Sequence, residues 1–341
     1  MKKLLVVPAF LLIFASVAHA QTPAPSPLKL TTSPVVVNLA TYPGQSVATD
    51  LKVENVGTTT KHLTMGLMKF SASGDTGVPK LMKRQPGDDY FDWVTFSDKT
   101  FDLAPNEWKT VKATFNIPKS AAYGYYYAVT FSEQGAKVPT GTATPVTALQ
   151  GASAILVLLN VQVPGEKPDL TISSFKTAHN FYQFLPVDFN VLVKNTGNIH
   201  VVPQGSIFIT RPGKNDDLSV ISLNQGQGTV LPQTSRLFSP SWLDGFPVYI
   251  TSTDKNGKTA RHLAWNFSEA NNFRWGPYTA HLILVYNNGT RDIPIEGTLG
   301  FWVIPWTFML GGLAVLLFVI VGLQATVRKL FVRAKRLTRQ K

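Results

Sequence analysis

The chain has 341 residues, contains no cysteine and carries a formal net charge of +12 at pH 7, from 32 Lys and Arg residues against 20 Asp and Glu residues. The lack of cysteine excludes thiol catalysis, disulfides and cysteine-bound zinc or iron–sulfur sites. The charge does not predict nucleic-acid binding, because two basic residues precede residue 21 and seven follow residue 325, which leaves 23 basic residues for the 20 acidic ones.

The first 20 residues have the features of a secretory signal peptide. Lys2 and Lys3 precede an apolar run from Leu4 to Val17, and Ala18-His19-Ala20 has the small-residue pattern that signal peptidase cleaves. We therefore expect residues 1–20 to be removed. Residues 21–27 contain three prolines and predict an extended leader.

A first β-sandwich is predicted over residues 28–163. Val47, Leu51 and Val53 alternate with polar residues, which predicts a strand with one buried and one exposed face. An apolar strand that begins at Ala152 closes this unit. The Pro- and Gly-containing residues 164–168 are the expected linker.

A second sandwich is predicted over residues 169–300, because three features of the first unit recur in the same order. Asn55-Val56-Gly57 ends one alternating strand and Asn195-Thr196-Gly197 ends another. Leu103-Ala104-Pro105-Asn106 precedes a strand as Leu231-Pro232-Gln233-Thr234 does, and Gly124-Tyr125 opens a strand as Gly276-Pro277-Tyr278 does. Three matches in one order predict two copies of one fold.

The fold class that follows is all-β, with two tandem Ig-like β-sandwiches and one transmembrane helix. Many short alternating runs are separated by Gly, Pro and Asn turns, and helical periodicity is scarce before residue 301. Asn256-Gly257 and Asn288-Gly289 are strong hairpin signals. No cysteine pair is present, so the units are Ig-like in architecture only.

The transmembrane helix is predicted over residues 301–325, with a basic tail over residues 326–341. The apolar run is long enough to cross a bilayer core, and no acidic residue follows Glu296. Trp302 and Trp306 suit one membrane interface, and Arg328 and Lys329 suit the other. The basic tail predicts a single-pass plasma-membrane protein with its N-terminus outside and the bulk of the chain in the extracellular or wall space.

Aromatic residues are the candidate binding residues. The odd-numbered residues 123–131 share one face of a predicted strand and are interpreted as core, which leaves Tyr126 as the more exposed ring. Tyr90, Trp93 and Trp108 are further candidates, because a tyrosine or tryptophan ring joins apolar area to a polar tip and can stack on a sugar. Core packing is the alternative interpretation for all of them.

Catalytic and metal-binding motifs are absent from the sequence. No histidine has a partner at metal-ligand spacing, and no nucleophile or phosphate-binding motif occurs. We therefore expect no enzymatic activity, no catalytic residue and no cofactor. The acidic segment Asp88 to Asp92 leaves two interpretations open, a solvated loop or a calcium site.

The assembled features resemble the WxL-interacting proteins of Gram-positive surfaces. The resemblance is carried by Pro43-Gly44-Gln45-Ser46 leading to Val53-Glu54-Asn55, by Leu103 to Lys109, by Ile117-Pro118 before the Tyr-rich strand, and by Phe301 to Trp306. It implies an N-terminal Ig-like domain that binds peptidoglycan, a second that binds a host or partner protein, and one membrane anchor.

Two non-enzymatic functions are considered from the sequence, and an envelope enzyme that binds a metal is the third hypothesis. The first is a non-enzymatic, membrane-anchored surface protein that binds cell-wall glycan or a partner surface protein through its Ig-like domains. The second is an envelope assembly or chaperone-like module that accepts a client strand at a sheet edge. The sequence does not distinguish the ligand, the sheet edge or face that binds, or the oligomeric state.

Overall fold

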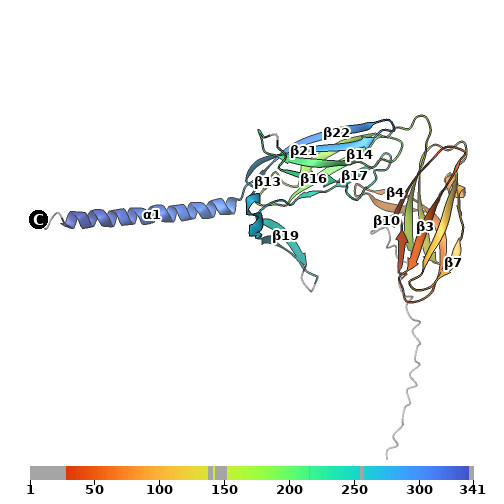
Figure 1. Ribbon diagram of the computed structural model, residues 1–341, viewed down its shortest axis with the longest axis horizontal. Coiled ribbons are helices and arrows are strands. Elements are labelled where there is room, and N and C mark those ends of the chain that lie inside the picture. The colour runs from red at the N-terminus through yellow and green to blue at the C-terminus, as the bar shows by residue number, and fades with distance from the viewer. Residues whose placement is uncertain (1–27, 137–140, 143–151, 215, 254–256, 338–341) are drawn as a thin grey trace, which may run out of the picture.

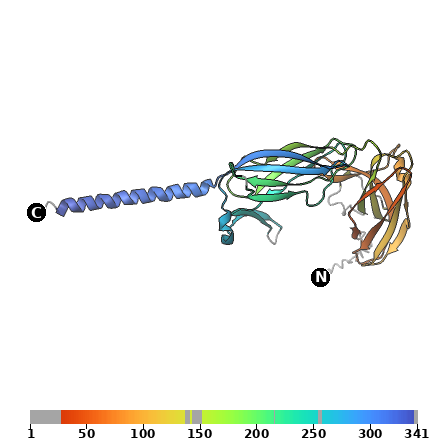
Figure 2. The ribbon, with the colours of Figure 1, turned by 45° about the horizontal axis from the view of Figure 1, so that its top comes forward.

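The computed structural model describes residues 28–136, 141–142, 152–214, 216–253 and 257–337. These residues form two β-sandwiches followed by one long helix, and the sandwiches lie at an angle to each other (Figure 1). The helix extends from the end of the second sandwich that is remote from the first (Figure 2). The predicted all-β fold class is confirmed. The predicted signal peptide and leader lie outside the described residues.

The first sandwich packs a four-stranded sheet, in the order β1-β3-β8-β6, on a larger sheet in the order β10-β5-β4-β9-β11-β2, where β7 also pairs with β4. The strands are β1 (Leu30–Ser33), β2 (Val36–Thr41), β3 (Ser46–Asn55), β4 (Lys61–Ser73), β5 (Val78–Met82), β6 (Val94–Phe96), β7 (Thr100–Leu103), β8 (Trp108–Asn116), β9 (Tyr123–Glu133), β10 (Gly141–Thr142) and β11 (Ala152–Val161), and a 3₁₀ helix, η1, spans Asp89–Trp93.

Strand β11 is apolar on both faces, which decides how the two sandwiches meet. Its odd-numbered residues, such as Ile155 and Val157, lie in the core between the two sheets of the first sandwich. Leu156 and Leu158 point to the outer face of the larger sheet, where Leu231 of the second sandwich packs in the same cluster. Because successive side chains of a strand point to opposite faces, a continuous apolar run needs cover on both sides.

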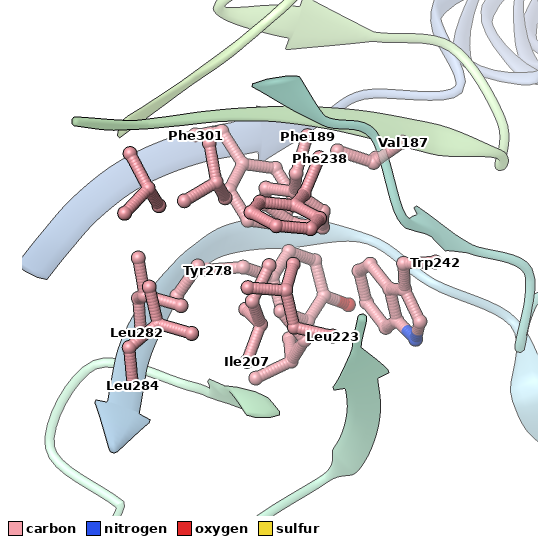
Figure 3. Close-up of a cluster of buried hydrophobic side chains, with 14 of the residues drawn as sticks. Val187, Phe189, Ile207, Leu223, Phe238, Trp242, Tyr278, Leu282, Leu284 and Phe301 are labelled. Carbon is pink, nitrogen blue, oxygen red and sulfur yellow. The ribbon is translucent and has the colours of Figure 1, made fainter. Parts of the chain in front are cut away.

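The second sandwich packs the sheet β12-β14-β17, where β18 also pairs with β14, on the sheet β13-β22-β21-β15-β16. Its strands are β12 (Leu170–Thr177), β13 (Phe181–Tyr182), β14 (Val187–Asn195), β15 (Gln204–Thr210), β16 (Ser219–Leu223), β17 (Ser235–Phe238), β18 (Ser241–Trp242), β21 (Gly276–Asn287) and β22 (Asp292–Val303). Figure 3 shows the core between these sheets, in which Trp242, Tyr278 and Phe301 are fully buried.

The Asn-x-Gly turns predicted as a repeat have the same hydrogen bonds in both sandwiches. The Asn55 side-chain amide donates to the carbonyl oxygens of Thr59 and Leu103, and its oxygen accepts from the Gly57 N–H. The Asn195 amide donates to Ile199 and Val230, and its oxygen accepts from the Gly197 N–H. Leu103 therefore corresponds to Val230 in the structure. The sequence pattern aligns Leu103 with Leu231, which is one residue later.

The predicted hairpin at Asn288-Gly289 connects β21 and β22, with Gly289 at φ 93° and the Asn288 N–H donating to the Arg291 carbonyl. The Asn256 position of the other predicted hairpin lies outside the described residues. The strands that flank it, β19 (Val248–Thr253) and β20 (Thr259–Ala264), pair antiparallel and form a separate two-stranded sheet. A 3₁₀ helix, η2 (Phe267–Asn272), follows β20.

The C-terminal helix, α1 (Trp306–Leu337), begins five residues later than predicted. Phe301 and Val303 belong to β22 and are buried in the core of the second sandwich, so they are not membrane residues. Pro305 ends the strand because it has no N–H to donate, and its carbonyl accepts from Phe308 and Met309 in the first helical turn. The segment Trp306–Lys329 is long and apolar enough to span a membrane.

Candidate functional site

Tyr90 and Trp93 are parts of an aromatic cluster within the first sandwich. Their rings lie 6.3 Å apart, and each packs against Tyr125, at 5.4 Å and 4.7 Å respectively. The Tyr127 hydroxyl donates to the Tyr90 carbonyl. These contacts serve the core, which is the alternative interpretation that the sequence allows for both residues.

Trp108 and Tyr126, the other two candidates, do not share a surface with each other. Trp108 begins β8 and is 47% exposed. Tyr126, expected to be the more exposed ring of its strand, instead lies in the cluster between the sandwiches, against Phe70 and against His200 of the second sandwich. The side chain is covered because the second sandwich lies over this face of the larger sheet.

The acidic segment at the start of η1 is neutralised by basic side chains. Asp88 is buried, pairs with Lys69 at 2.9 Å and accepts from the Gln85 N–H, and these contacts lower the pKa of its carboxyl group. Asp92 accepts two hydrogen bonds of 2.6 Å from Arg84. Two carboxylates of the segment are thus already paired with cations, which disfavours a calcium site. Asp89 and Asp92 are exposed, as a solvated loop requires, whereas Asp88 is not. No cluster of three potential metal ligands occurs in the described part of the chain.

A cavity of about 320 Å³ lies between the two sandwiches, over the outer face of the larger sheet. Its floor is largely apolar, with the polar residues Asn38 and Ser71, and comes from β2, β4, β5 and β11 of the first sandwich. Its wall comes from β17 of the second sandwich and from the segment before it. The floor residues are Val36, Asn38, Phe70, Ser71, Ala72, Gly77, Pro79, Leu156 and Leu158, and the wall residues are Gly226, Gln227, Gly228, Thr229, Leu231 and Arg236.

Arg236 supplies the positive charge of this cavity. Its guanidinium group lies between Gly77 of the first sandwich and Gly228 of the second. A Cβ atom added at Gly77 would lie 2.6 Å from the Arg236 Cζ, and one added at Gly228 would lie 2.5 Å from it, so neither position has room for a side chain while the guanidinium group lies there. Nη1 donates to the Thr229 carbonyl oxygen at 3.0 Å, and burial lowers the pKa of the group. No carboxylate of the described residues lies within salt-bridge distance of Arg236.

Direct contacts between the sandwiches border the cavity. The Leu237 N–H of β17 donates to the Asp75 carbonyl, in the turn between β4 and β5, at 2.6 Å. His200 packs edge-on against Tyr126 at 5.8 Å, and burial lowers the pKa of His200 to about 4. The wall and the floor are therefore held together by polar and apolar contacts on both sides of Arg236.

The edge strand β2 borders the same cavity. It pairs in parallel with β11 through Val35 and Thr41, whose carbonyl oxygens accept from Leu156 and Gln162. Since the hydrogen-bonding groups of a strand alternate in direction, the N–H and C=O groups of Val36, Asn38 and Ala40 point away from β11. These three residues are exposed, and no strand in the described part of the chain pairs with that side of β2.

Sequence reasoning missed Arg236, Gly77 and Gly228 because they lie far apart in the chain and match no motif. One signal was available. The run from Ala152 is apolar at both odd and even positions, which predicts that a second layer covers the outer face of its sheet. The position of that layer, and the charge it brings, come from the tertiary structure alone.

No protein-family model matches the chain, and no curated protein matches it. Among solved structures, it is similar to the class 5 fimbriae chaperone CfaA, with 13% identity over 79% of this chain and 98% of that one and a TM-score of 0.36. It is also similar to the YadV chaperone, with 14% identity over 80% of this chain and 99% of that one and a TM-score of 0.33. The Escherichia coli chaperone DraB has 12% identity over 70% of this chain and 98% of its own, with a TM-score of 0.31. At these TM-scores the similarities do not establish what the chain binds.

Proposed function

We propose that the chain is a membrane-anchored, non-enzymatic envelope module that binds an extended segment of a partner protein between its two sandwiches. The unpaired outer edge of β2, beside a cavity with a largely apolar floor, carries this proposal. A strand that pairs with this edge gains backbone hydrogen bonds, and its alternate side chains enter the cavity. This is the client-strand function considered from the sequence.

The chemistry of the partner segment follows from the cavity. Phe70, Leu156 and Leu158 favour apolar side chains at every second position of the bound strand. Arg236 favours an acidic side chain next to them, because its guanidinium has no carboxylate partner in the described part of the chain. The expected ligand is an extended peptide with alternating apolar residues and one carboxylate.

The membrane anchor completes the proposal. Segment Trp306–Lys329 spans the bilayer, and the basic residues from Arg328 onward stay on the cytoplasmic side. Both sandwiches then lie outside the cytoplasmic membrane. Because α1 leaves the second sandwich at the end remote from the first, the cavity is held away from the bilayer (Figure 1).

Binding to wall glycan has less support from the geometry. A glycan site built on ring stacking needs several exposed aromatic side chains on one surface, and the four aromatic candidates predicted from the sequence do not form one. Tyr90 and Trp93 pack in the first sandwich, Tyr126 is covered by the second, and Trp108 stands apart from them. We therefore prefer the protein-strand function, and we use glycan binding as the competing outcome of the test.

The test uses the full chain in detergent micelles and fluorescent 12-residue peptides that alternate Leu with Thr and contain one Asp. Asn38→Pro removes an N–H that points away from β11, so it deletes an edge donor without breaking the β2–β11 ladder. Asn38→Val is the matched control, because it also loses the amide side chain but keeps the N–H. We expect at least tenfold weaker peptide binding for Asn38→Pro than for Asn38→Val.

Arg236→Gln tests the charge separately. We expect it to weaken binding of the Asp-containing peptide and to leave the binding of the same peptide with Asn unchanged. Equal peptide affinity of the Asn38→Pro and Asn38→Val chains would contradict edge pairing. Retention on purified cell wall by both variants, with no peptide binding by either, would support the glycan function instead.

A further inference from the structure

Four exposed aromatic side chains lie in one short segment, and two of them, Trp265 and Phe273, pack on the first turn of α1. Trp265, Phe267, Phe273 and Trp275 lie in the segment that connects β20 to β21, and we call them the aromatic collar. Their exposed fractions range from 37% for Phe273 to 73% for Phe267. Apolar side chains gathered in this way on a folded domain mark an interaction surface.

The collar is continuous with the helix through Phe308. The Phe308 ring stacks on Trp265 at 5.6 Å and on Phe273 at 6.2 Å, with interplanar angles of 26° and 6°. Phe308 also contacts Phe184 at 5.0 Å. Because Phe308 follows Trp306 by two residues, it lies only about 3 Å further along the helix. If the first turn of α1 lies at the membrane surface, the collar residues that contact it lie at the same depth.

Hydrogen bonds hold the chain just before α1, and its first turn, against the second sandwich. The Ile304 N–H donates to the Tyr182 carbonyl at 2.7 Å, and the Trp302 N–H donates to the Asn180 carbonyl at 2.9 Å. The Gln183 side chain bonds both Thr307 in the first helical turn and Tyr249 of β19. The position of the collar along the axis of α1 is therefore held by these contacts.

The segment that carries the collar has two charged side chains, of which Glu269 in η2 is exposed and accepts a hydrogen bond from the Asn272 side chain. The nearest basic residue along the chain, Arg274, is buried and pairs with Asp244 at 2.7 Å. Trp and Phe suit the boundary between lipid headgroups and acyl chains, where a Trp ring can be partly apolar and partly hydrogen-bonded and where a carboxylate such as that of Glu269 can stay in the headgroup layer.

We propose that the aromatic collar inserts into the interfacial region of the lipid leaflet that α1 enters. This inference rests on the membrane anchor of the proposed function. Because η2 lies beside the helix start and the β19–β20 hairpin extends sideways from it (Figure 1), the second sandwich contacts the bilayer at two places. The two contacts restrict tilting of the sandwiches, and they present the β2 edge in one orientation.

The test uses single-cysteine variants of the full chain, which has no cysteine of its own. Phe267→Cys reports on the collar, Leu316→Cys on the middle of the span and Trp108→Cys on an exposed site of the first sandwich. Each is spin-labelled and placed in nanodiscs of phosphatidylethanolamine and phosphatidylglycerol. The readout is the ratio of accessibility to oxygen, which partitions into lipid, over accessibility to a water-soluble nickel complex.

We expect the ratio at residue 267 to be several-fold higher than at residue 108 and to approach that at residue 316. A water-like ratio at 267 with a lipid-like ratio at 316 would overturn the collar proposal while the anchor stands. A water-like ratio at 316 would overturn the anchor and the collar together. Low accessibility of 267 to both reagents would indicate a protein contact, such as a second copy, and would also overturn it.

Trp275→Cys, another collar position, provides a second variant if the chain with Phe267→Cys does not fold. The same lipid-like ratio is expected there, and a water-like ratio at Trp275→Cys with a lipid-like Leu316→Cys would again overturn the proposal.

Discussion

The Asn55–Gly57 turn of the first sandwich and the Asn195–Gly197 turn of the second share their hydrogen bonds but differ in what surrounds them. An ideal Cβ at Gly57 would meet only the Asn55 side chain, at 3.0 Å. At Gly197 it would lie 1.9 Å from the Lys167 carbonyl oxygen, in the linker between the sandwiches. One motif thus closes a strand end in the first sandwich and also holds the linker in the second.

The linker contacts show why this difference matters for the site. The Asn198 N–H donates to the Lys167 carbonyl, and the Asn198 side chain bonds both the Lys167 N–H and the Gly165 carbonyl. The second turn therefore holds the linker that joins the two sandwiches, in addition to the direct contacts around Arg236. Two copies of one local motif can thus have the same internal hydrogen bonds while only one of them makes contacts with the linker between domains.

The largest expected effect is that of Gly197→Ala. The added methyl group collides with backbone rather than with a flexible side chain, so the linker must detach and lose its hydrogen bonds. We expect the free energy of unfolding to fall by about 4 kcal/mol. Gly57→Ala is the matched control, with an expected loss of about 1 kcal/mol, because its added methyl group crowds only the Asn55 side chain. Denaturant unfolding of the full chain in micelles measures both, and equal losses would break the comparison.

Asn55→Ala and Asn195→Ala test the part of the motif that the sandwiches share. Each removes three hydrogen bonds at a fully buried residue and leaves backbone groups without partners. We expect each to lower the free energy of unfolding by about 3 kcal/mol. Equal losses in the same unfolding assay would sharpen the comparison. A large loss at only one site would show that the two turns are not equivalent.

His200 provides a pH-dependent test of the contact between the sandwiches. Its folded pKa of about 4 lies below the ordinary value of 6.5, so the unfolded chain binds more protons between these values. The contribution of His200 to the free energy of unfolding is therefore fully present above pH 6.5. It is lost as the pH decreases from 6.5 to 4, and it does not change further below pH 4. We expect a loss of about 3 kcal/mol across the window.

The measurement compares the pH dependence of unfolding for the native chain and for His200→Gln, which cannot titrate. The difference between the two curves isolates the histidine from the carboxyl groups. Curves of the same shape would mean that His200 is not covered by Tyr126 in solution.

The smallest expected effect is that of calcium on the first sandwich. Asp88 and Asp92 are paired with Lys69 and Arg84, so added calcium finds no free carboxylate cluster there. We expect no shift of the thermal unfolding midpoint of the native chain between millimolar calcium and chelator. A calcium-dependent rise in the midpoint that Asp92→Asn abolishes would restore the calcium interpretation.

The start of α1 shows where sequence reasoning loses accuracy. Hydropathy places Phe301 and Val303 with the membrane segment, because both are apolar and adjoin it. In the structure both complete the core of the second sandwich, since alternate residues of β22 face that core. Composition alone does not separate a buried strand from the beginning of an apolar helix.

Tyr126 shows a second limit, which concerns surfaces. Period-two spacing placed Tyr127, Val129 and Phe131 on the core face, and all three are fully buried. It placed Tyr126 on the opposite face, which is also where it lies. Whether that face is open to water depends on what packs over it, and the second sandwich covers it.

By itself, the sequence determined the strands, the Asn-x-Gly repeat, the all-β class and the apolar C-terminal helix. These follow from local alternation, turn chemistry and hydropathy, which act between residues close together in the chain. Only the tertiary structure decided that Gly77, Gly228 and Arg236 meet, that β2 is an unpaired edge beside a cavity, and that Phe308 joins the helix to the aromatic collar. Such contacts join residues far apart in the chain, and their geometry depends on how one sandwich packs on the other.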